Sequence, residues 1–145
     1  MIVKNSAGKR REVVFRMFFP ATRPQIEKLL AFIADNHSKR DVYFTVIMRY
    51  LTETYIATGC GIEGLYAERR AKSDKLRCIR REQAALTNTW WPAHNHRKEY
   101  LAGLEDAAQQ IKRRQRRITA ELFEVKLRSN RLEQNIKWMT EVKPW

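Results

Sequence analysis

The chain has 145 residues and carries 29 lysines and arginines against 16 aspartates and glutamates, a formal net charge of +13. Hydrophobic residues make up 43% of it, enough for a packed core, so the composition excludes a disordered polycation. Only 5 glycines and 4 prolines are present, and long stretches lack both, which favours long helices over an all-β fold.

Residues 12–19 are β-branched and aromatic and stop at Pro20, a pattern that predicts a strand. Alternation divides these side chains into two sets, one on each face of the strand. The set expected to face the core is wholly apolar and comprises Val13, Phe15, Met17 and Phe19. The alternative is a strand buried on both faces within an α+β domain.

Two helices are predicted after this strand. Thr22 and Gln25 match a capping box with a proline in the first turn, and the apolar stripe that follows predicts a helix over residues 23–35. Ser38 begins a second cap signature, which predicts a helix over residues 39–57. We expect this second helix to stop at Gly59, a typical C-terminal residue.

Two heptad patterns occupy the rest of the chain. Over residues 62–86 five of eight seam positions are apolar, and over residues 101–139 ten of twelve are. The segment between them, which contains Pro92, predicts a loop near residues 88–96. The second arm would be about 60 Å long and the first about 40 Å, so a homodimer or another partner is expected to cover the surplus.

The predicted fold is therefore mainly α. A small N-terminal module over residues 1–59 holds a short strand and two helices. A basic helical hairpin, antiparallel and coiled-coil-like, occupies residues 60–145. The apolar run at residues 42–48 is far shorter than the roughly 20 residues of a membrane span, and no secretory leader pattern is present, so we expect a cytoplasmic protein without membrane association.

The strand, proline and two capped helices over residues 12–57 resemble the ribbon-helix-helix family of DNA-binding dimers. In that family, strands from two chains pair as a ribbon in the major groove, and their outward side chains read bases. The resemblance implies that Arg16 contacts a base. It also implies that the amides around Ser38, Lys39 and Arg40 clamp a phosphate.

Positive charge is spread along the whole chain, which suits extended contact with a polyanion, most often nucleic acid. The densest run holds five cations within residues 112–117, and a second basic segment lies at residues 69–81. The phosphate-contacting side chains predicted here are Arg77, Arg80, Arg81, Lys112, Arg113, Arg114, Arg116 and Arg117. The alternative is a solvated face that is partly neutralised by Glu105, Asp106, Glu121 and Glu124.

Trp90 and Trp91, in the predicted loop, have more than one possible role. They can stack on the bases of a single strand, because an aromatic face accepts any base. Alternatively they pack at the end of the hairpin or anchor a partner protein.

Chemistry beyond binding is not indicated. The sequence holds no nucleophile triad, phosphate-binding glycine loop or paired acidic site, so we predict no enzyme and no cofactor. The two cysteines, Cys60 and Cys78, lie too far from each other and from the histidines for a zinc site, so no metal is predicted.

Two functional hypotheses follow. The first is a non-enzymatic nucleic-acid-binding protein, with DNA favoured over RNA, of the size and charge balance of plasmid or phage accessory and regulatory proteins. The second is a protein-interaction or inhibitor module whose basic hairpin docks on an acidic surface of a larger assembly. Both hypotheses expect a homodimer.

Overall fold

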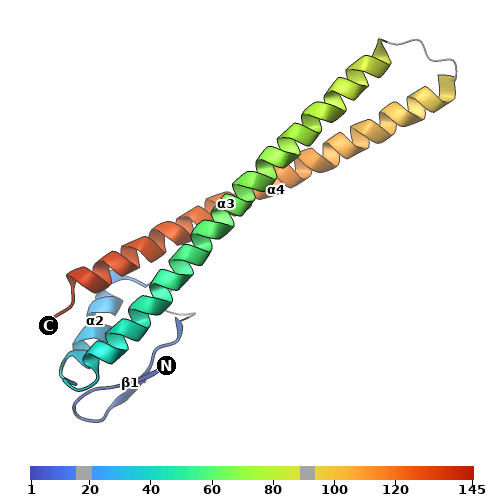
Figure 1. Ribbon diagram of the computed structural model, residues 1–145. Helices are drawn as coiled ribbons and strands as arrows, with labels where there is room; N and C mark the ends of the chain where they lie inside the picture. The colour runs from blue at the N-terminus through green and yellow to red at the C-terminus, as the bar shows by residue number, and fades with distance from the viewer. Residues whose placement is uncertain (16–20, 89–93) are drawn as a thin grey trace. The chain divides into compact units, whose positions relative to one another are not determined.

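The computed structural model describes residues 1–15, 21–88 and 94–145, and it confirms the mainly α fold (Figure 1). The described part of the chain contains the strands β1 (Ile2–Lys4) and β2 (Arg10–Glu12) and the helices α2 (Arg23–Ala34), α3 (Arg40–Thr87) and α4 (His94–Glu141). It divides into two compact units. The first comprises Met1–Gly61 and Val125–Trp145, and the second comprises Ile62–Glu124. The last 21 residues therefore belong with the N-terminal module rather than with the hairpin to which the sequence assigned them.

The N-terminal sheet is an antiparallel hairpin in which β1 pairs with β2 of the same chain. Its turn contains Gly8 at φ 76°, in the left-handed region that favours glycine, and the Asn5 side chain accepts the amide of Lys9 at 2.8 Å. Sequence patterning missed β1 and all of β2 except Glu12. Each strand has only three residues, and β2, Arg-Arg-Glu, is polar and exposed. A short exposed strand carries no apolar alternation to detect.

The strand predicted over residues 12–19 is wrong where the structure describes it. Of these residues only Glu12 lies in a strand, Phe15 is helical, and residues 16–19 lie outside the described residues. The apolar pattern reports burial instead. Val13 is buried and the Phe15 ring stacks on Tyr50 with 4.0 Å between ring centroids, so both face the core as expected without forming a strand.

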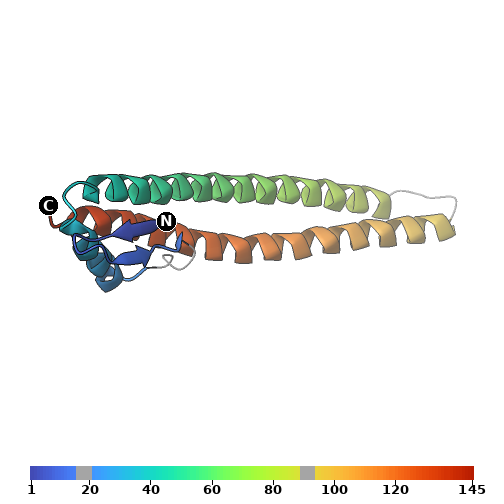
Figure 2. The same cartoon turned by 90° about the horizontal axis from the view of Figure 1, so that it is seen from below.

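Helix α2 begins and ends close to the predicted bounds. The amide of Thr22 donates to the side-chain oxygen of Gln25 at 2.9 Å, which is one half of the predicted capping box. The helix buries one apolar stripe: Ile26, Leu29, Leu30 and Ile33. Figure 2 shows α2 and both strands beside the start of α3 and the end of α4, which complete the core of the first unit.

Asn36 joins the sheet to α3. Its side-chain amide donates to the carbonyl of Lys4 at 2.8 Å, and its own carbonyl accepts the amide of Arg40 at 2.8 Å. The Ser38 hydroxyl, predicted to cap this helix, instead donates to the Asn36 side chain at 3.1 Å. The corner between α2 and α3 is therefore tied to β1 through one residue.

Helix α3 does not stop at Gly59 but continues to Thr87, so that part of the prediction is wrong. A glycine inside a helix costs about 1 kcal/mol without ending it, and no proline follows before the end of α3. Helices α3 and α4 are consequently 48 residues each, and the unequal arms expected from the sequence do not exist.

In the second unit, α3 and α4 run antiparallel and side by side, as both views show (Figures 1 and 2). Every predicted α3 seam position over residues 62–86 is buried or half-buried, and so are the α4 seam positions from Leu101 to Leu122. The helical hairpin is therefore confirmed. Among the described residues, no helix is both long and apolar enough to cross a bilayer.

Each unit covers its own part of the α4 seam. Ile118 and Leu122 are buried in the second unit, and Leu132 and Met139 are buried in the core of the first. A homodimer was expected because a single chain would leave a stretch of this seam in water. That premise does not hold.

Replacing the helical glycines of α3 by alanine is expected to stabilise the protein. A methyl group added at Gly59, Gly61 or Gly64 would have no atom within 4 Å apart from the adjoining backbone of its own helix, and none of the three has positive φ. Each substitution should therefore raise the free energy of unfolding by about 0.5–1 kcal/mol, measured by urea denaturation. Gly8→Ala, in the left-handed turn, is the control that should lower it. A loss of stability at the α3 glycines would contradict a continuous helix there.

Candidate nucleic-acid interface

Arg114, a predicted phosphate contact, is already occupied by carboxylates of the hairpin. Its Nε and Nη2 atoms donate to the two oxygens of Glu68 at 2.7 and 2.9 Å, and Nη1 donates to Glu121 at 3.2 Å. The hydrogen bonds from Arg114 lower the pKa of Glu68 below its ordinary value. Such a forked pair fixes the register of α4 against α3. Arg114 therefore ties α4 to α3 within the hairpin, and its role as a phosphate contact stays a prediction.

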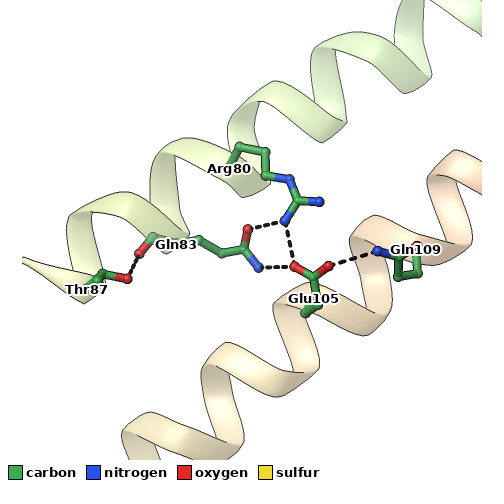
Figure 3. A network of polar contacts seen from close by, with 5 residues as sticks. All are labelled: Arg80, Gln83, Thr87, Glu105 and Gln109. Atoms are coloured by element: carbon green, nitrogen blue, oxygen red, sulfur yellow. Dashed lines mark hydrogen bonds and ion pairs between the residues drawn. The ribbon is translucent and has the colours of Figure 1, made fainter.

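Arg80 is also engaged within the hairpin, in a network that Figure 3 shows from close by. Its Nη1 atom donates to the Glu105 carboxylate at 2.6 Å and to the Gln83 side chain at 2.7 Å. Gln83 and Gln109 donate to the same carboxylate at 3.0 and 2.8 Å. These hydrogen bonds, that from Arg80 above all, lower the pKa of Glu105 to about 2.

This network predicts a loss of stability in acid. The carboxyl of Glu105 has a pKa of about 2 in the folded chain against 4.5 ordinarily, so its contribution is complete above about pH 4.5 and is lost as the pH falls toward 2. The difference in unfolding free energy between the wild type and Glu105→Gln should therefore shrink over that range. Urea denaturation at a series of pH values measures it. A difference that stays constant with pH would contradict this role.

Three arginines of the same basic run are free of such partners. Arg113, Arg116 and Arg117 are exposed, and none of the ion pairs or hydrogen bonds found within the described residues involves their side chains. Separations of three and four residues make them neighbours on one helix surface. We call these three residues the outer arginine patch.

Two of the four carboxylates expected to neutralise this run are held by arginines outside the patch. Glu105 binds Arg80, and Glu121 binds Arg114. Within the patch, Arg113 and Arg117 are a like-charged pair at i,i+4, which destabilises a helix by a few tenths of a kcal/mol. The patch therefore keeps a concentrated positive charge that the hairpin itself does not use.

Phe123 lies close to the outer arginine patch and is 72% exposed. It follows Arg116 by seven residues, two helical turns or about 10 Å along the same face of α4. Sequence analysis missed it because one apolar residue off the heptad seam adds nothing to the periodic signal. The signal available was an aromatic at a position that the heptad assigns to solvent.

The other predicted contacts of the second unit are Arg77, Arg81 and Lys112. Arg77 lies 3.5 Å from Asp74, Arg81 is exposed, and Lys112 is half-buried. Positions opposite the seam on two paired helices face away from each other. Arg77 and Arg81 on α3 therefore do not share one surface with Arg113 on α4.

In the first unit, Arg40 has a structural role and Lys39 is exposed. The Nη1 atom of Arg40 donates to the carbonyl of Ala34, the last residue of α2, at 3.1 Å. Its guanidinium also lies over the Trp145 ring, 5.4 Å from the centroid. Three further candidates, Arg16, Trp90 and Trp91, lie outside the residues that the structure describes.

The β-hairpin carries cations that sequence analysis did not select. Lys9, Arg10 and Arg11 are all exposed, and Lys4 lies directly across the hairpin from Arg10. Without the missed strands, these residues were only a basic N-terminal segment. Pairing places them on a defined ribbon.

Over the described ranges, no group of three or more histidine, cysteine or acidic side chains is placed to hold a metal ion, and Cys60 and Cys78 are exposed free thiols.

Comparisons with known proteins reveal no relative of this chain. The ribbon-helix-helix resemblance stays a prediction. No family model matches the sequence, and comparisons with curated proteins and with solved structures give no match either.

Proposed function

We propose that this protein binds nucleic acid, DNA in preference to RNA, through the outer arginine patch of α4, and that it does so without catalysis. The observation that carries the proposal is the exposure of Arg113, Arg116 and Arg117 without carboxylate partners in the described part of the chain. Arginine forks match phosphate oxygens in two places at once. The cytoplasm is the compartment we propose for this activity.

Two further features support the proposal. A bound phosphate would relieve the repulsion within the patch, which the folded chain otherwise retains. Phe123, two turns further along the same face, offers an aromatic surface to a base or a sugar. Cations beside an exposed aromatic are typical of surfaces that bind a nucleic-acid strand.

The test begins with purification of the full chain with and without nuclease. Nucleic acid should co-elute from the untreated preparation at low salt. Fluorescence anisotropy with a labelled duplex and a labelled single strand should then give a log affinity that falls linearly with log salt between about 50 and 200 mM. Failure to bind either probe at the lowest salt would overturn the proposal.

The second candidate function is docking on a protein with an acidic surface. It is favoured by Phe123 in the second unit, a large aromatic side chain that is 72% exposed. If it is right, the nuclease-treated chain should retain one acidic partner that Phe123→Ala releases. Trp90→Ala with Trp91→Ala tests the loop in the same way.

A further inference from the structure

A second basic surface lies in the first unit, in a groove between the β-hairpin and the start of α3. Three cations line it: Lys4 of β1, Arg10 of β2 and Lys39, which immediately precedes α3. Its apolar lining is supplied by Ile2, Val42 and Tyr43. We call this surface the hairpin groove.

Two of these cations face each other across the sheet. Lys4 and Arg10 are directly opposed partners in the antiparallel register, so their side chains lie on the same face of the ribbon. Like charges in opposed positions destabilise a pair of strands. A ribbon of three-residue strands retains this repulsion although a neutral residue at either position would remove it.

The backbone holds Lys4 in place independently of its charge. Its amide donates to the hydroxyl of Tyr43 at 3.3 Å, and its carbonyl accepts the side-chain amide of Asn36 at 2.8 Å. Both partners come from the segment that starts α3. These hydrogen bonds fix the Lys4 backbone against the beginning of α3, and therefore also against Lys39, which immediately precedes α3.

The nearby carboxylates are committed to other groups. Asp35 accepts the amide and the hydroxyl of Ser6, and Asp41 accepts the indole N–H of Trp145 at 2.7 Å. Glu12 shares a face of β2 with Arg10 but does not line the groove. No ion pair found in the described part of the chain neutralises the three cations of the groove.

The groove thus combines three cations from separate elements, an apolar side and the positive end of a 48-residue helix. The cations and the helix end favour an anion, and the apolar side favours a ligand that also has a non-polar surface. A phosphodiester meets both requirements, since its oxygens bind cations and its sugar packs on apolar side chains. Inorganic phosphate meets only the first.

We propose that the hairpin groove binds phosphate groups of a nucleic-acid backbone, with Lys4, Arg10 and Lys39 as their ligands. This is a second contact surface, separate in the chain from the outer arginine patch. It rests on the proposed function only for the source of the phosphate. The cations and their arrangement stand without it.

The test compares two double variants of the full chain. Lys4→Gln with Arg10→Gln removes the opposed pair, and Lys9→Gln with Arg11→Gln removes the same charge from the turn and the other face of the hairpin. The first double variant should reduce the magnitude of the slope of log affinity against log salt by about 1.8, since each phosphate contact contributes about 0.9. The control should change it by less than half as much. The midpoint temperature of thermal unfolding of the first variant should equal or exceed that of the wild type, because the repulsion between Lys4 and Arg10 has been removed.

Equal changes in slope for the two variants, or no change for either, would overturn the groove as a site. If the wild type binds nucleic acid and only the patch variants weaken it, the groove proposal fails and the proposed function stands. If the wild type binds no nucleic acid, the groove is tested instead by titration with inorganic phosphate. Perturbation by phosphate of the NMR signals of Lys4, Arg10 and Lys39, absent from the double variant, would support an anion site while the proposed function fails.

Discussion

We expect a triple variant, with glutamine in place of Arg113, Arg116 and Arg117, to reduce the magnitude of the slope of log affinity against log salt by about 2.7. Binding should weaken most at low salt. All three side chains are exposed and without carboxylate partners within the described residues, so each is available for one phosphate. The free energy of unfolding should stay the same or rise slightly, since the i,i+4 repulsion disappears. Fluorescence anisotropy and urea denaturation measure the two effects on the same preparation.

The matched control removes three charges from the outer face of α3, as Arg70→Gln, Arg77→Gln and Arg81→Gln. The formal charge of the chain changes by the same amount. The slope should change by less than about one, because these residues face away from the patch and Arg77 already has Asp74 nearby. Equal losses of slope in both triple variants would mean that total charge, and not the patch, determines binding.

The largest expected effect on stability comes from the apolar seam of α4. Leu132 is 1% exposed in the core of the first unit, and Leu132→Ala should lower the free energy of unfolding by about 2–5 kcal/mol. Leu127→Ala is the matched control on the same helix. Leu127 is 42% exposed, so its truncation should cost well under 1 kcal/mol.

The same denaturation experiments test whether a second chain covers the seam. Ile118 and Leu132 are both buried within one chain, so the unfolding midpoint should not depend on protein concentration. Ile118→Asp should then destabilise the fold itself by placing a charge where the side chain is fully buried. A midpoint that rises with concentration, or Ile118→Asp giving a folded monomer, would restore the homodimer expected from the sequence.

Local sequence patterns predicted most of the fold. The cap at Thr22 and the stripe that starts at Ile26 located α2, and seven-residue periodicity located both halves of the hairpin. Two differences between the prediction and the structure have a plain physical reason. The exposed strand at Arg10–Glu12 has no apolar pattern, and Gly59 does not stop a helix whose following residues have a partner to pack on.

The candidate site could be predicted only as a basic region. Arg113 and Arg114 are neighbours in the same basic run, yet only Arg114 is held by a carboxylate, that of Glu68, 46 residues away. Arg80 is held by Glu105 in the same way, 25 residues away. Which cation meets a carboxylate depends on the register of α3 against α4, and that register comes from packing along the whole seam rather than from any local pattern.

Arginine-selective chemical modification, read by mass spectrometry with and without saturating duplex, tests the central claim most directly. Arg113, Arg116 and Arg117 should react in the free protein and become protected when nucleic acid is bound. Arg80 and Arg114, held by carboxylates, should react slowly in both states. Unchanged reactivity of the outer arginine patch in a preparation that demonstrably holds nucleic acid would contradict the account.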